Sequence, residues 1–79
     1  MSGLTFGQVL KRIRTQQGVS QEKLAEWCEL DRTYISLLER DLRQPTLATI
    51  FKLATALQTT PSELVAQVES LSKPSQQEG

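Results

Sequence analysis

Hydrophobic residues recur along most of this chain with the three- and four-residue spacing of amphipathic helices. The first stripe consists of Phe6, Val9, Leu10 and Ile13, and Gly18 follows it as a helix stop. Four comparable segments follow, so we predict an all-α fold of five helices. In the fourth predicted helix the stripe consists of Leu47, Ile50, Leu53, Ala54 and Leu57.

Residues that cap helix N-termini precede each stripe, where their side-chain oxygens can accept hydrogen bonds from the first backbone amides. From residue 70 onward the chain is polar and contains a proline, which predicts a helical domain over residues 1–69 and a flexible polar tail over residues 70–79. The predicted caps are Thr5, Ser20, Asp31, Thr46 and Thr60, and Gln8 and Glu63 complete capping boxes with the first and the last of them.

Three predicted helix ends lack the glycine that such ends often contain, because Glu29, Asp41 and Gln58 occupy them. A residue at this position usually adopts a left-handed conformation with positive φ. Aspartate tolerates that conformation reasonably well, whereas glutamate and glutamine cost on the order of 1 kcal/mol relative to glycine. We therefore expect positive φ at all three positions.

Residues 21–40 contain two short amphipathic helices joined by a tight turn. Leu24, Ala25 and Cys28 share one face of the first, and Ile35 and Leu38 share one face of the second. These faces can pack together, with the small Ala25 at the closest crossing. The outer face of the second helix then carries side chains that can contact base edges and phosphates, namely Arg32, Thr33, Ser36, Leu37 and Arg40.

The composition argues against several kinds of chemistry. With one cysteine and no histidine among 79 residues, the chain can form neither an internal disulfide nor a Cys/His zinc site, and it has no imidazole base. Cys28 falls on the buried face of its helix, which favours a small core residue over a reactive thiol. The carboxylates and hydroxyls form no catalytic grouping, so we expect no enzyme activity, no metal, no cofactor and no small-molecule ligand.

The formal net charge is zero, unlike that of the strongly basic domains of indiscriminate nucleic-acid binders. The charge is nevertheless unevenly distributed. Residues 1–20 contain Lys11, Arg12 and Arg14 and no acid, whereas residues 63–79 contain three glutamates and one lysine. A few well-placed cations suffice for specific DNA binding, while non-specific affinity should be modest.

A chain of 79 residues is long enough for one small domain with one apolar core. We expect no separate ligand-sensing domain, so control would act through protein concentration, dimerisation or a partner protein. The apolar runs are too short to span a bilayer and no signal segment opens the chain, so we expect a cytoplasmic protein with no membrane partner.

Several segments together resemble the Cro/phage-repressor type helix-turn-helix regulators. They are GQVLKRIR at residues 7–14, GVSQ at 18–21, LDRTYIS at 30–36, ER at 39–40 and PT at 45–46, and the resemblance covers about residues 6–68. LDRTYIS particularly resembles the controller proteins of restriction-modification systems. The resemblance implies a five-helix, lambda-repressor-like DNA-binding domain whose homodimer binds operator half-sites in double-stranded DNA.

By this resemblance, the second helix of the helix-turn-helix lies in the major groove. Arg32 would bind a guanine edge, and Thr33 and Ser36 would lie near base or phosphate oxygens. Leu37, expected to be exposed, would fit a thymine methyl group or a partner surface. The alternative is an ordinary solvated helix face. Tyr34 either reaches a phosphate or packs at the helix edge.

The resemblance also implies contacts to the DNA backbone and one internal ion pair. Gln21, at the start of its helix, would brace a phosphate near the positive end of the helix dipole. Arg14 and Glu39 would pair, partly buried, and hold the reading helix in place, with two independent surface charges as the alternative. The further phosphate contacts are Arg40, Arg43 and Thr46, with surface solvation as the alternative.

Some apolar residues exceed the needs of a small core. Trp27, on the outer side of the second helix, either folds over the core edge or meets DNA or protein. Val65, Val68 and Leu71 extend the stripe of the fifth helix, and Phe51 lies off the stripe of the fourth. A two-fold dimer surface explains them, because a C2 interface buries one patch against itself. Closure of the monomer core is the alternative.

The sequence thus predicts a sequence-specific DNA-binding transcriptional regulator that occupies an operator overlapping or flanking a promoter. A restriction-modification controller protein would both activate and repress from tandem sites. The alternative class is a protein-interaction module, such as an antitoxin or an adaptor. Trp27, Leu37 and the neutral net charge are the features that favour this alternative.

Overall fold

The computed structural model describes residues 4–72, with the backbone alone described for residues 69–72. The predicted five-helix, all-α fold is confirmed. The expected tail is described only as far as Ser72, to which the backbone of the last helix extends, and residues 73–79 lie outside the described part. The helices are α1 (Phe6–Gln16), α2 (Gln21–Cys28), α3 (Arg32–Glu39), α4 (Leu47–Ala56) and α5 (Pro61–Ser72).

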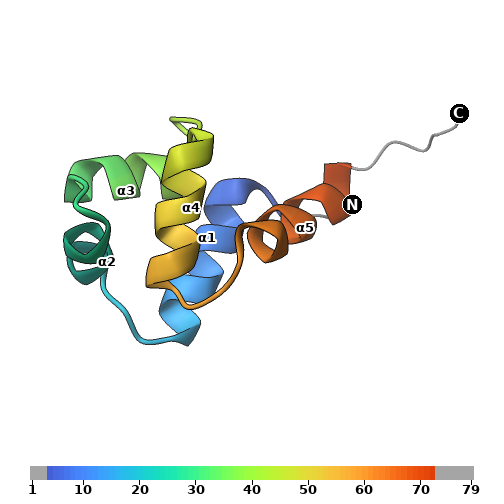
Figure 1. Cartoon of the computed structure of the whole chain (residues 1–79). Helices are drawn as coiled ribbons and strands as arrows, with labels where there is room; N and C mark the ends of the chain where they lie inside the picture. Colours follow the sequence, from blue (N-terminus) through green and yellow to red (C-terminus); the bar gives the residue numbers. More distant parts are fainter. Residues whose placement is uncertain (1–3, 73–79) are drawn as a thin grey trace, which may run out of the picture.

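In the view of Figure 1, α4 lies near the centre of the molecule, with α2 and α3 on one side and α5 on the other. α1 packs against both α3 and α5, and α4 packs against both α2 and α5. The α2–α3 pair is therefore supported by α1 and α4. None of the helices in residues 4–72 combines the length and the apolar character needed to cross a membrane.

One apolar core joins all five helices, and its side chains are at most 3% exposed. The faces of α2 and α3 that the sequence predicts to pack together both contribute to it. Burial of such side chains is the main favourable contribution to folding in a domain of this size. The core consists of Val9, Leu10, Leu24, Ala25, Cys28, Ile35, Leu38, Leu53, Ala54, Leu57 and Leu64.

The predicted N-caps all accept a hydrogen bond from a backbone amide in the first turn of their helix. The capping box at the start of α1 is complete, because the Gln8 side chain also accepts from the Thr5 amide at 3.0 Å. The donor–acceptor distances are 3.1 Å at Thr5, 3.0 Å at Ser20, 3.3 Å at Asp31, 3.1 Å at Thr46 and 3.1 Å at Thr60.

Positive φ occurs at all three expected helix ends, with values of 57° at Glu29, 60° at Asp41 and 59° at Gln58. Gly18 has a φ of 71° at the end of α1. The residue after each of them donates its amide to the carbonyl five positions back, as in Leu30 to Ala25 at 2.9 Å. This is the Schellman arrangement, in which the left-handed residue lets the chain satisfy a terminal carbonyl.

The expected stripe of α4 is wrong at one position. Leu47 is 74% exposed, whereas Leu53 and Leu57 are fully buried. At about 100° per residue, Leu47 lies about 80° around the helix from Leu57 and about 120° from Leu53, outside the arc that these two leucines define. It is also the first residue of α4. Phe51, predicted to lie off this stripe, is 58% exposed.

The α1 and α3 backbones approach closely at Gly7. A Cβ atom there would lie 2.5 Å from the carbonyl oxygen of Leu38 and 2.6 Å from that of Glu39. Asp41 strengthens the same junction, because its carboxylate accepts from the Gly7 amide at 3.0 Å and from the Thr5 hydroxyl at 2.6 Å. Tolerance of positive φ is therefore only part of the reason for aspartate here, since its side chain also caps α1.

Gly7→Ala should destabilise the domain although alanine is the better helix former. The added methyl group must push α1 away from α3, and overpacking of this kind typically costs about 1–3 kcal/mol. Urea unfolding followed by circular dichroism measures the change. Gly18→Ala is the matched control, because no atom lies within 4 Å of its Cβ position and only the strain of positive φ remains. A Gly7→Ala protein as stable as the wild type would contradict the close packing.

Candidate nucleic-acid interface

The outer face of α3 carries the side chains that the sequence assigns to base reading. Arg32 and Thr33 are exposed in its first turn, and Ser36 is half-buried one turn later. Asp31 is the N-cap of α3, and its side chain accepts a hydrogen bond from the Thr33 amide in this exposed first turn. An exposed first turn that presents a guanidinium and a hydroxyl has the chemistry needed to contact base edges in a major groove.

At two neighbouring side chains, the structure corrects the exposure expected from the sequence or decides between two alternatives. Leu37, expected to be exposed, is half-buried. It lies about 100° around the helix from the buried Leu38 and therefore borders the core face. Tyr34 is also half-buried and packs against the core, which is the helix-edge alternative. The exposed part of the reading face is consequently narrower than the sequence suggested.

A buried ion pair holds α3 against α1. Arg14 Nε lies 2.6 Å from Glu39 Oε2, and Arg14 Nη2 donates to Glu39 Oε1 at 3.0 Å. The side chains are 11% and 3% exposed. Arg14 Nη1 also donates to the Val19 carbonyl at 2.8 Å. The predicted pair is therefore present and bidentate, and it links α1, the turn before α2 and the end of α3.

Gln21 joins the same network. Its side-chain Nε2 donates to Glu39 Oε1 at 2.9 Å, and the residue is half-buried. The sequence expectation assigned Gln21 to a DNA phosphate, and the structure gives it an internal partner that the sequence did not suggest. Its place in the first turn of α2 is unchanged. A carboxylate that accepts from Arg14 and Gln21 together also fixes how α2 and α3 lie relative to each other.

Substituting Arg14 or Glu39 singly by alanine should lower the free energy of unfolding by about 3–5 kcal/mol, because the remaining charge stays buried without its partner. The double substitution should cost clearly less than the sum of the two. Urea unfolding of the three variants and the wild type gives the coupling energy. Lys23→Ala provides a control, since its contact with Glu26 is 3.5 Å long and exposed, and should change stability little. Strict additivity would mean that Arg14 and Glu39 do not interact in solution.

Three arginines near the reading face have no role inside the domain. Arg32, Arg40 and Arg43 are exposed, and within residues 4–72 their guanidinium groups form no hydrogen bond or ion pair. Arg12 differs, because it donates to Gln67 Oε1 at 2.7 Å and thereby joins α1 to α5. Exposed cations without an internal partner are available for an external anion.

Two helix N-termini complete the candidate phosphate contacts. The first backbone amides of a helix have no acceptor within it, and together with the helix dipole they favour a bound anion. In α2, Ser20 caps the Lys23 amide, and in α4, Thr46 caps the Thr49 amide. The Thr46 hydroxyl also lies 3.0 Å from that of Thr49. Thr46 therefore has a capping role beside the DNA contact that the sequence suggests.

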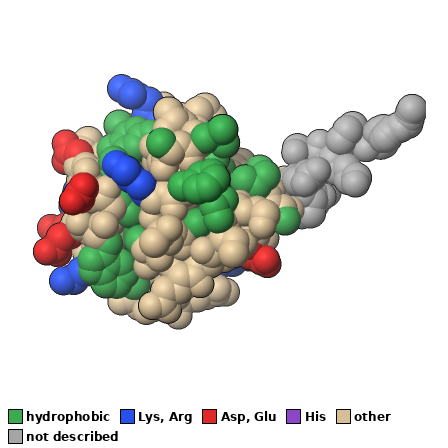
Figure 2. All heavy atoms as spheres, in the orientation of Figure 1, with side chains coloured by type: hydrophobic (Ala, Val, Ile, Leu, Met, Phe, Trp, Pro, Cys, Tyr) green, Lys and Arg blue, Asp and Glu red, His purple; other side chains and the backbone are tan. Residues whose placement is uncertain are grey.

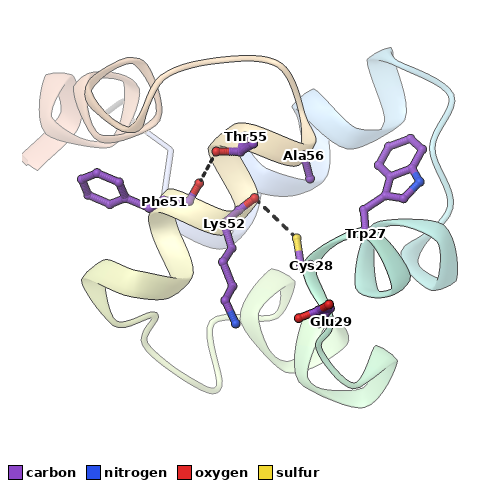
Figure 3. Close-up of a pocket in the computed structure, with 7 residues that line it drawn as sticks. All are labelled: Trp27, Cys28, Glu29, Phe51, Lys52, Thr55 and Ala56. Carbon is purple, nitrogen blue, oxygen red and sulfur yellow. Dashed lines mark hydrogen bonds between the residues drawn. The ribbon is translucent and has the colours of Figure 1, made fainter.

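A groove of about 350 Å³ lies between α2 and α4. Figure 3 shows Trp27 and Phe51 at its opposite ends, with Cys28 and Lys52 between them. Trp27 is 51% exposed and thus only partly covers the core edge. Burial raises the pKa of the Cys28 thiol, and the nearby charge of Lys52 lowers it by less. A buried thiol with a raised pKa is a poor nucleophile at neutral pH.

The residues assigned to dimerisation separate into two groups. Phe51 and Val65 are 58% and 43% exposed, whereas Val68 is half-buried and packs against the core. The side chain of Leu71 lies outside the described residues. The exposed Leu47, which the sequence includes in the apolar stripe of the fourth helix, contributes further apolar surface on α4. Figure 2 shows hydrophobic side chains over α2, α4 and α5 on this one face.

The described residues contain no group of three or more cysteine and carboxylate side chains that could hold a metal ion. The titratable side chains on or beside α3 are Glu29, Asp31, Tyr34, Glu39, Asp41 and the arginines already described, and Glu39 and Asp41 form the internal contacts given above. The arrangement is therefore suited to binding through exposed cations and hydroxyls.

The chain is similar to known regulators in both sequence and structure. The sequence profile of the helix-turn-helix family matches residues 10–64. Control protein C.BamHI of Bacillus amyloliquefaciens is 46% identical over 63 residues, which are 78% of this chain and 78% of that protein. The structure of the restriction-modification controller protein C.AhdI from Aeromonas hydrophila is 51% identical, with a TM-score of 0.73 over 75% of this chain and 89% of that one. SinR, a master regulator for biofilm formation solved in complex with DNA, is 29% identical, with a TM-score of 0.73 over 77% of this chain and 98% of that one.

Proposed function

The chain belongs to the helix-turn-helix family of DNA-binding transcriptional regulators, and we propose that it is a restriction-modification controller protein that binds operator half-sites as a homodimer. The proposal rests chiefly on the exposed first turn of α3, where Arg32 and Thr33 face solvent. It acts by binding and not by catalysis. Its site of action is the cytoplasm, where the operator DNA lies.

Base reading is proposed for α3. Arg32 donates to the O6 and N7 acceptors of a guanine, since a guanidinium can bind both at once. Thr33 and Ser36 contact neighbouring base or phosphate oxygens, and the half-buried Leu37 reaches a thymine methyl group with the part of its side chain that remains exposed. The ion pair of Arg14 with Glu39 positions the helix without touching DNA.

Phosphate binding is proposed for the groups around α3. Arg40 and Arg43 neutralise phosphates, and the first backbone amides of α2 and α4, beside Gln21 and Thr46, donate hydrogen bonds to two more phosphates. Tyr34, whose ring packs against the core, contributes its hydroxyl to the DNA backbone. Because the net charge is zero, this set of contacts must supply most of the affinity at a specific site.

A homodimer is supported by the exposed apolar side chains Leu47, Phe51 and Val65, which lie on α4 and α5. Exposed apolar surface of this kind commonly marks a protein interface. Dimers of helix-turn-helix domains bind two half-sites whose spacing matches the distance between the two reading helices. The half-sites of the operator should therefore form an inverted repeat.

Arg32→Ala and Arg43→Ala should affect DNA binding differently. Arg32→Ala should weaken the free energy of binding to the preferred operator by about 1–3 kcal/mol and relax the preference at one G·C position, because the O6 and N7 acceptors of the guanine lose their donor. Arg43→Ala should weaken binding to all sequences similarly and flatten the slope of log affinity against log salt by about one per half-site. Selection of DNA fragments with each variant, followed by titration at several salt concentrations, measures both effects.

An unchanged selected sequence for Arg32→Ala would contradict the assignment of α3 as the reading helix. Wild-type protein that binds no selected DNA, but instead copurifies with a protein partner, would favour the interaction module over the regulator.

Val65→Asp should shift the protein to monomer, because it places a carboxylate in the apolar surface. It tests dimerisation better than a charge at Val68, which would also disturb the core. Sedimentation at about tenfold above the wild-type dissociation constant measures the shift, and DNA affinity should fall with it. Val65→Thr keeps the side-chain shape without charge and should have a much smaller effect. A Val65→Asp protein that remains dimeric would remove Val65 from the interface.

A further inference from the structure

The exposed apolar side chains of α4 and α5 are few for a stable interface. Leu47, Phe51 and Val65 form this surface, which we name the α4–α5 surface. A stable protein interface usually buries roughly 800 Å² on each partner, whereas even a large aromatic side chain contributes only about 150–250 Å². Three side chains, each already partly covered, fall short of that area. An interface of the usual size therefore extends beyond these three side chains.

The groove between α2 and α4 adjoins the α4–α5 surface. Phe51 belongs to both, because it is exposed on α4 and also lines the groove. At about 100° per residue, Lys52 and Ala56 lie to one side of Phe51 around the helix and Leu47 to the other. Figure 2 shows hydrophobic side chains over α2, α4 and α5 on a single face. The α4–α5 surface and the groove are thus continuous across Phe51.

The groove offers a large apolar side chain that the monomer does not use. Trp27 is 51% exposed at the end opposite Phe51, as Figure 3 shows. The Cys28 thiol, 3.6 Å from the Lys52 carbonyl, lines the groove without leaving a strong polar group unsatisfied. Glu29 and Lys52 bring charged groups to the same lining. An apolar centre with charged groups beside it matches the usual anatomy of a protein interface.

We propose that the groove of each copy receives the partner subunit's Leu47 and Phe51 in the homodimer, so that Trp27 becomes an interface residue. This inference rests on the homodimer of the proposed function. In a two-fold interface whose axis passes close to Phe51, the groove side of one copy faces the α4–α5 surface of the other. Leu47 and Phe51 of one copy then lie opposite the groove of its partner, and the two-fold axis repeats the same contact.

Trp27 itself reports on this arrangement, because it is the single tryptophan of the chain. Its fluorescence emission and its quenching by acrylamide are measured across a dilution series of the full chain, alongside sedimentation. We expect the emission to shift to shorter wavelength and the quenching to fall as the dimer forms, with the same midpoint as the sedimentation curve. Dimerisation that leaves both signals unchanged would overturn the role of the groove and leave the homodimer itself intact.

Variants distinguish this inference from the proposed function. Trp27→Ala should raise the dimer dissociation constant at least about tenfold, since large aromatic side chains are common energetic anchors of interfaces. Circular dichroism checks that the variant folds, and Thr55→Asp, which adds a charge at another exposed groove residue, provides a second test. Glu22→Ala is the control on the same helix and should dimerise like the wild type.

The outcomes separate the two claims. Weakened dimers for both Trp27→Ala and Thr55→Asp, with an unaffected Glu22→Ala, would support a groove filled by the second copy. Wild-type affinity in both groove variants, together with loss of the dimer in Val65→Asp, would overturn it while supporting a dimer confined to α4 and α5. A wild-type protein that stays monomeric at all concentrations tested would overturn both the inference and the proposed homodimer.

Discussion

The buried ion pair between Arg14 and Glu39 is the interaction on which the reading surface depends. Moving two charges out of water is unfavourable, and the arrangement is tolerated only when their hydrogen-bonding groups find partners. Here Arg14 uses Nε, Nη1 and Nη2, and Glu39 accepts from both Arg14 and Gln21. The carboxylate that ends α3 can satisfy these donors only in one position. The direction of α3, and with it the orientation of Arg32, follows from this constraint.

A second contact between α1 and α3 makes the same orientation rigid. The missing side chain of Gly7 lets the two backbones approach, and the Asp41 carboxylate caps α1 from the turn that follows α3. The ion pair and this junction lie about two turns apart on α1 but both at the C-terminal end of α3, so together they anchor that end of the helix against α1. A helix that must present a few side chains to a groove benefits from such preorganisation, because less freedom is lost on binding.

The proposed reading and self-association surfaces lie on different parts of the domain. Within the described residues, the arginines without an internal partner lie on and after α3, whereas four of the five exposed large apolar side chains lie on α2, α4 and α5, and the fifth, Leu42, follows α3. In the proposed dimer this division leaves both reading helices accessible while the apolar surfaces bury each other. The neutral net charge is consistent with it, since a small number of cations is concentrated where the DNA would lie.

The sequence by itself determined the features that depend on neighbours within about five residues. The caps at Ser20 and Asp31, the positive φ at Glu29 and the buried faces of α2 and α3 follow from short-range hydrogen bonds and the helical repeat. The resemblance added the partner of Arg14, which spacing alone could not identify. Tertiary structure alone decided that Gln21 binds Glu39 and that Asp41 caps α1. In each of these cases, the outcome depends on which distant segment packs beside the residue, and a local pattern along one helix contains no information about that neighbour.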